Sequence, residues 1–146
     1  MPYKHQLFED LKNADNDILG VGVQAILLVE DSVRYYSTYL PELYKMIIKQ
    51  STEFLKETLN VQQRKFRKRS RPKILLATNL DDAMAMYSKY KSNLLGVISD
   101  VGFTVHKEDR SEDEKLDAGI DLVKHIREDD PVMPILLQSS QGNISI

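Results

Sequence analysis

The sequence predicts an α/β protein, a three-layer open parallel sheet whose two faces are covered by helices. Short, continuous apolar runs alternate along the chain with longer amphipathic segments. The apolar runs lack the polar alternation of half-exposed strands, which is typical of strands buried on both faces. When such strands alternate with helices, crossover connections make the strands parallel.

The first half of the chain contains one predicted strand between two predicted helices. Residues 5–17 form a short polar helix, and the segment GVGVQ then breaks it. Residues 25–29, AILLV, form the first buried strand. A long amphipathic helix follows from about residue 33 to residue 64. Pro41 either kinks this helix or lies in the first turn of its main part.

Three further strands are predicted, at residues 74–78 (ILLAT), 94–99 (LLGVIS) and 134–140 (PILLQSS). The helix between the first two of these begins at the capping residue Asn79, with Asp82 three residues on. A second helix, over residues 120–128, directs Ile120, Val123 and Ile126 toward the core. We interpret residues 1–24 as an N-terminal extension or linker helix and residues 25–146 as the folded domain.

The composition argues against several classes of function. The net charge of −2 is atypical of a general nucleic-acid binder. The chain has no cysteine, and its histidines (His5, His106 and His125) do not have zinc spacing. No apolar run approaches the roughly 18 residues that span a bilayer, and the N-terminus lacks the apolar stretch of a signal peptide. We therefore expect a cytoplasmic protein without a membrane partner.

Polar side chains follow the predicted strands directly. Glu30 and Asp31 end the first strand, Asp100 ends the third, and Ser139 and Ser140 end the fourth. Open parallel sheets bind ligands at the carboxyl ends of their strands, where the strand order reverses. In a sheet ordered 2-1-3-4 the first and third strands are neighbours, so the three carboxylates converge. Clustered carboxylate oxygens suit Mg²⁺.

These segments together resemble a response-regulator receiver domain, the phosphoaccepting module of two-component signal transduction. The resemblance covers residues 25–140 and depends on several short motifs in the right order. The motifs are the acidic pair Glu30-Asp31, GVISDV around Asp100, PILLQSS with Ser139, AGIDLVKHIR at 118–127, and NLDDAMAMY at 79–87. The resemblance implies a receiver-like or flavodoxin-like sheet ordered 2-1-3-4.

The resemblance also implies a mechanism. Asp31 and Asp100 would bind Mg²⁺ directly, Glu30 largely through water, and the Gly102 carbonyl would complete the protein ligands. Asp100 would accept a phosphoryl group from a histidine kinase or phosphotransfer protein, with Mg²⁺ neutralising charge. Ser139 would hydrogen-bond the phosphoryl group and move the adjacent surface. No enzyme activity is implied beyond this self-phosphorylation.

An enzyme of the phosphohydrolase or nuclease class is a further alternative. Such sites require a second acid two residues after the first on one strand. Asp100 is instead followed by Val101 and Gly102, which argues against this class.

Two connecting segments depart from the receiver pattern. The first helix is much longer than in the family and leads into a basic run over residues 64–73. We interpret this run as a solvated helix end, with contact to nucleic acid or an acidic partner, or pairing with the acidic segment 108–114, as alternatives. The loop over residues 101–118 is also extended and contains the acidic run 108–114. Because this loop is highly charged with few apolar anchors, we expect it to be solvent-exposed and mobile.

The end of the sequence departs from the pattern as well. The fifth strand of a receiver carries a lysine that contacts the phosphoryl group, and no residue after the predicted fourth strand matches it. The alternative function is therefore a degenerate pseudo-receiver, an interaction or regulatory module of a larger protein. Several segments also resemble a receiver-like module of bacterial proteins related to phosphoenolpyruvate synthase. An exposed fourth strand would favour homo-oligomers.

Overall fold

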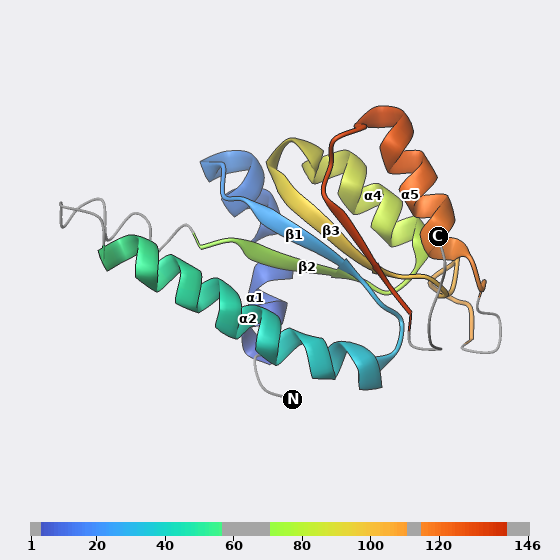
Figure 1. Cartoon of the computed structure of the whole chain (residues 1–146), viewed down its shortest axis with the longest axis horizontal. Coiled ribbons are helices and arrows are strands. Elements are labelled where there is room, and N and C mark those ends of the chain that lie inside the picture. The colour runs from blue at the N-terminus through green and yellow to red at the C-terminus, as the bar shows by residue number, and fades with distance from the viewer. Residues whose placement is uncertain (1–3, 57–70, 111–114, 140–146) are drawn as a thin grey trace.

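The computed structural model describes residues 4–56, 71–110 and 115–139. Its centre is a four-stranded parallel sheet in the order β2-β1-β3-β4 (Figure 1). The strands are β1 (Ala25–Val29), β2 (Lys73–Ala77), β3 (Leu94–Asp100) and β4 (Ile135–Gln138). The predicted α/β class, strand order and parallel direction are all confirmed.

The helices that the structure describes cover both faces of the sheet. They are α1 (Lys4–Lys12), the π-helix η1 (Asp15–Val21), α2 (Val33–Lys56), α4 (Leu80–Tyr90), the short 3₁₀ helix η2 (Lys91–Asn93) and α5 (Ala118–Asp129). Two apolar cores result, because successive strand residues point to opposite faces. In β1, Leu27 and Val29 face the core under α4 and α5, whereas Leu28 faces the core under α1 and α2. None of these helices has a stretch long and apolar enough to cross a membrane.

The N-terminal helix differs from its prediction. A single helix was expected over residues 5–17, but α1 ends at Lys12 and the π-helix η1 continues the helical chain to Val21. The glycine that ends it is Gly22, which has a φ of 87° and donates its N–H to the Ile18 carbonyl at 3.1 Å. A left-handed residue of this kind is favourable for glycine because no Cβ clashes with the backbone.

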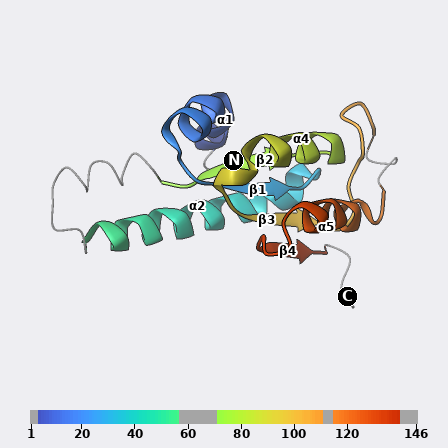
Figure 2. The same cartoon turned by 90° about the horizontal axis from the view of Figure 1, so that it is seen from above.

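Asp10 fastens α1 to the edge of the sheet at β2. Its carboxylate accepts hydrogen bonds from the Tyr44 hydroxyl at 2.9 Å, from the Ile74 backbone N–H at 3.0 Å and from the Arg71 guanidinium at 3.0 Å. The Lys73 ammonium lies 3.6 Å away. In Figure 2, α1 accordingly lies beside β2, at the opposite side of the sheet from β4.

The long helix α2 passes through Pro41 without ending. The buried residues Leu40, Leu43, Tyr44 and Ile47 recur at helical spacing and form the core on this face. The predicted extension of this helix from Lys56 to residue 64 lies outside the described residues, as does most of the basic run 64–73.

The other two long helices begin close to their predicted starts. Asn79 caps α4 as expected, since its side chain accepts the Asp82 N–H at 2.8 Å. For α5, the prediction that Ile120 points inward is wrong, because 37% of that residue is exposed. The helix begins two residues earlier than predicted, and Ala118, Leu122 and Ile126 make its buried stripe.

Candidate metal centre

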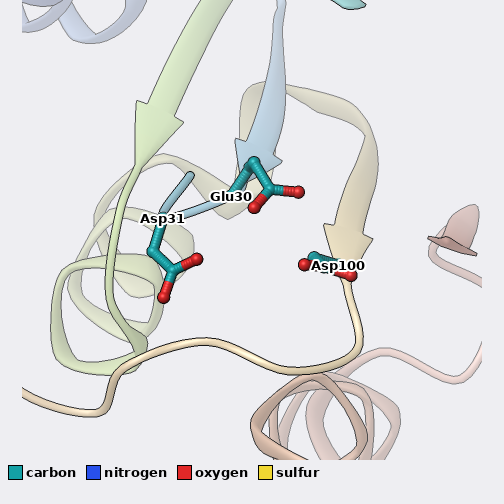
Figure 3. Close-up of side chains that lie close together, drawn as sticks. All are labelled: Glu30, Asp31 and Asp100. Atoms are coloured by element: carbon teal, nitrogen blue, oxygen red, sulfur yellow. The ribbon is translucent and has the colours of Figure 1, made fainter. Parts of the chain in front are cut away.

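Three carboxylates from two neighbouring strands meet at the carboxyl edge of the sheet. Glu30 and Asp31 follow β1, Asp100 is the last residue of β3, and these strands pair directly. One carboxylate oxygen from each residue lies within 4.8 Å of those of the other two (Figure 3). The predicted convergence is therefore confirmed. The cause is the order 2-1-3-4, which places the first and third strands side by side.

The cluster is largely removed from solvent. Only 3% of Glu30 and 9% of Asp100 are exposed, and Asp31 is partly buried. Each carboxylate accepts one backbone N–H from a nearby loop residue. The donors are Ser32 to Glu30 at 3.1 Å, Thr104 to Asp31 at 3.0 Å and Val101 to Asp100 at 2.8 Å. These bonds orient the side chains, but they leave most of the carboxylate lone pairs available.

Burial raises the pKa of all three carboxyl groups, and that of Glu30 reaches about 8. The negative charges of Asp100 and Asp31 raise the pKa of Glu30 further, while the Ser32 N–H opposes the shift. A hydrogen bond between Glu30 and Asp100 raises the pKa of the first and lowers that of the second. The pKa of Glu30 is therefore raised far above its ordinary value, as expected when like charges are forced together out of water.

The donor set fits a hard divalent cation. It consists of carboxylate oxygens alone, without the sulfur or imidazole ligands that softer metals prefer. Within the part of the chain that the structure describes, no lysine, arginine or histidine forms an ion pair with these acids. A magnesium ion takes oxygens at about 2.0–2.1 Å, so two oxygens bound to one ion lie at most about 4.2 Å apart. The oxygens of this cluster, all within 4.8 Å of one another, lie close to that limit.

The other two predicted site residues follow strands that end at the same edge of the sheet as the cluster. Ser139 directly follows β4, whose Gln138 pairs with Asp100 in the sheet register, and its side chain is partly buried. Gly102 is the second residue of the loop after Asp100 and is also partly buried. Their roles, as phosphoryl hydrogen bond and carbonyl ligand, stay predictions.

The start of α5 is pressed against the backbone of Asp100. The Gly119 N–H donates to the Val101 carbonyl at 2.7 Å. A Cβ at position 119 would lie 2.2 Å from the Asp100 carbonyl oxygen, so any larger residue would displace the end of β3 or the helix. The glycine in the AGIDLVKHIR motif thus allows α5 to fix the position of Asp100.

Sequence reasoning missed Thr104, and the prediction for its loop is partly wrong. The loop was expected to be exposed, but Val101, Phe103 and Thr104 are buried. Phe103 inserts into the core under α4 and α5, and Thr104 donates its N–H to Asp31. His106, Lys107 and Glu108 are exposed as expected, whereas residues 111–114 of the same loop lie outside the described residues and its mobility stays a prediction. The apolar Phe103 within a charged segment was the available signal for this anchor.

Comparisons of this chain with protein-family models, with curated proteins and with solved structures found no match.

Proposed function

We propose that this chain is a receiver-type signalling domain that binds Mg²⁺ and accepts a phosphoryl group on Asp100. One observation carries the proposal: buried carboxylates of β1 and β3 converge at the carboxyl edge of a 2-1-3-4 parallel sheet. No described cation neutralises them, and burying acids in this way is unfavourable unless a ligand uses them.

In the proposed step, an Asp100 carboxylate oxygen attacks the phosphorus atom of a phosphohistidine on a kinase or phosphotransfer protein. A P–O bond forms, the P–N bond breaks, and the leaving imidazole keeps the electron pair and takes up a proton. A bound Mg²⁺ would neutralise charge on the carboxylates and the phosphoryl oxygens. The chain itself supplies position, since Val101 N–H and the contact with Gly119 hold Asp100 in place.

The remaining residues have supporting roles in this proposal. Asp31 is a direct ion ligand, Glu30 acts mainly through water, and Gly102 offers its carbonyl. Ser139, one residue beyond the strand that pairs with β3, would hydrogen-bond the phosphoryl group. A histidine kinase or phosphotransfer protein of the cytoplasm would be the phosphodonor, so the proposal includes a cytoplasmic location.

A test uses a small phosphodonor, acetyl phosphate, with and without Mg²⁺. We expect Mg²⁺-dependent, slow formation of an acyl phosphate, located by peptide mass spectrometry at Asp100 and removed by hydroxylamine. Asp100→Asn should abolish it, whereas Asp10→Asn, which changes another buried acid, should retain it. Modification that is independent of Mg²⁺ or located at other acids would contradict the proposal.

The second candidate is a pseudo-receiver that binds the ion and a protein partner without phosphoryl transfer. The observation that favours it is that no described lysine or arginine contacts the acid cluster, so no described cation would hold a phosphoryl group there. Mg²⁺ binding that depends on Asp31 and Asp100, combined with no acyl phosphate at any time, would select this function over the first.

A further inference from the structure

A short segment after β3 connects the acid cluster with the outer surface of the domain. We define the 103–106 strap as Phe103, Thr104, Val105 and His106. Its first residue is anchored: Phe103 is fully buried and exchanges both backbone hydrogen bonds with Lys115, each at 3.1 Å. Its last residue is exposed, so the strap runs from the core outward.

The inner end of the strap holds one acid of the cluster. The Thr104 N–H donates to Asp31 Oδ2 at 3.0 Å, and the Thr104 hydroxyl donates to the Thr78 carbonyl at 3.3 Å. Thr78 directly follows β2, so Thr104 joins the ends of β1 and β2. The position of Thr104 therefore limits the rotation of the Asp31 side chain.

The outer end of the strap holds the start of α4. The first N–H groups of a helix have no partner within the helix. Here Leu80 N–H donates to the Thr104 carbonyl at 2.9 Å, and Asp81 N–H donates to the Val105 carbonyl at 3.0 Å. The His106 ring contacts the Asp81 carboxylate at 2.7 Å, and both side chains are exposed. One continuous set of hydrogen bonds thus leads from Asp31 to a surface pair.

We propose that Thr104 is a positioning residue for the cation site and that the 103–106 strap transmits cation binding to the surface at the start of α4. This inference rests on the proposed cation site but not on phosphoryl transfer. A cation on one Asp31 oxygen and Thr104 N–H on the other select the same orientation of that side chain. Binding of the ion and docking of the strap therefore favour each other, and such coupling is reciprocal.

The first test measures amide hydrogen exchange by NMR with and without Mg²⁺ at constant pH and ionic strength. We expect the exchange of Thr104, Leu80 and Asp81 amides to slow at least about threefold when Mg²⁺ binds, because their local opening is suppressed. Amides on the opposite face of the sheet, such as Tyr44 in α2, serve as the internal reference for any global change in stability.

The second test uses reciprocity, with variants that leave every proposed ligand intact. Thr104→Val keeps the backbone donor and the side-chain shape but loses the hydroxyl bond to Thr78. Asp81→Asn removes the charge of the surface pair. We expect Mg²⁺ affinity, measured by calorimetry, to fall about fivefold for Thr104→Val and less for Asp81→Asn. Asp129→Asn, an exposed acid paired with Lys91, changes the net charge equally and should leave affinity unchanged.

The outcomes separate this inference from the function on which it rests. Mg²⁺ binding that requires Asp100 but leaves the strap amides and both strap variants unaffected would overturn the inference alone. No Mg²⁺ binding at all would overturn the cation site and the inference together. If Thr104→Val does not fold, the exposed Asp81→Asn variant and the exchange measurement on the unmodified chain still decide the question.

Discussion

The domain buries carboxylates at two places, a single one at the β2 edge and a group of three at the carboxyl edge, and among the described residues only the first has cations beside it. At the β2 edge, Asp10 is completely buried and meets two cations, Arg71 and Lys73, together with the Tyr44 hydroxyl and the Ile74 N–H. Its charge is compensated by the chain itself. This carboxylate is therefore explained by structure alone, as the contact that fastens α1 to the sheet.

The second place, at the carboxyl edge, has three acids. Within the residues that the structure describes, no lysine, arginine or histidine forms an ion pair with them. Glu30, Asp31 and Asp100 each accept a backbone N–H, and Glu30 also shares a hydrogen bond with Asp100, but burial raises the pKa of each carboxyl group. Their arrangement opposes folding in the ionised form, since like charges lie together out of water. The comparison teaches that burial of an acid alone says little about function, whereas burial without compensation indicates a ligand.

The largest expected effect is the loss of the compensated acid. Asp10→Asn keeps the side-chain shape but leaves Arg71 and Lys73 without their buried partner, so we expect the free energy of unfolding to fall by about 4 kcal/mol in urea denaturation at neutral pH. Glu42→Gln, which breaks the exposed pair with Lys45, should cost less than about 1 kcal/mol. Equal losses in both variants would show that Asp10 is not the structural contact described.

The uncompensated acids predict a stability that falls as pH rises. The pKa of Glu30 is about 8 in the folded chain, compared with the ordinary glutamate value of 4.5 that applies in the unfolded chain. The folded state thus binds more protons between these values, and stability decreases across that window. Without divalent ions, Glu30→Gln should match the unmodified chain near pH 4.5 and be more stable by about 4 kcal/mol at pH 8. A stability difference that is constant with pH would exclude the raised pKa.

Binding of a cation should offset the unfavourable charge of the three acids at the carboxyl edge, and it should not depend on Asp10. At about ten times its dissociation constant, Mg²⁺ should stabilise the unmodified chain by about 1.4 kcal/mol in urea denaturation at pH 8. Asp100→Asn should lose this increment, and Asp10→Asn, although less stable, should retain it. An increment that survives in Asp100→Asn would place the ion elsewhere. Affinity should also rise from pH 5 to pH 8, because protons compete for the same oxygens.

The acid cluster at the carboxyl edge could be predicted from the sequence, whereas the buried contact of Asp10 could not. Glu30, Asp31 and Asp100 directly follow apolar runs, and the geometry of parallel sheets brings such positions together. Asp10 lies in a polar helix, and its hydrogen-bond partners are 34 to 64 residues away. Local patterns contain no information on contacts of that kind.

The same distinction explains the smaller errors. The first three strands were predicted to within one residue at each end, because a buried strand is a local apolar run, whereas the strand predicted over 134–140 ends at Gln138. The orientation of Ile120 was wrong because the phase of α5 is set by its tight contact at Gly119 with the backbone of Asp100, a tertiary effect. The burial of Phe103 and Thr104 was missed because the prediction was based on the charged composition of the whole loop. Phe103 is nevertheless part of the core, and Thr104 donates its N–H to Asp31.

The two edge strands of the sheet also differ, because, as far as the structure describes the chain, one is covered and the other is not. At the β2 edge, the Asp10 carboxylate accepts the outward N–H of Ile74 and α1 covers the strand. Within the described residues β4 is the opposite edge, with no comparable carboxylate on its backbone. Its residues ILLQ carry no charge, and 53% of Leu136 is exposed. An open surface depression of about 260 Å³ adjoins it, lined by Ile26, Ile98, Pro134 and Leu136 among others.

The smallest expected effect follows from this edge. An uncharged, apolar edge strand offers unpaired N–H and C=O groups to another strand, so we expect weak self-association through β4, seen as a rise in average mass with concentration in analytical ultracentrifugation. Leu136→Lys places a charge on the exposed side of the strand and should keep the chain monomeric, because pairing two copies would bring like charges together. Lys is better suited than Pro here, since it leaves the backbone of β4 and its pairing with β3 unchanged. The matched control is Val132→Lys, whose residue is 85% exposed in the preceding loop and outside the edge. If both variants suppress association equally, net charge is the cause; if neither does, residues other than the β4 edge hold the copies together.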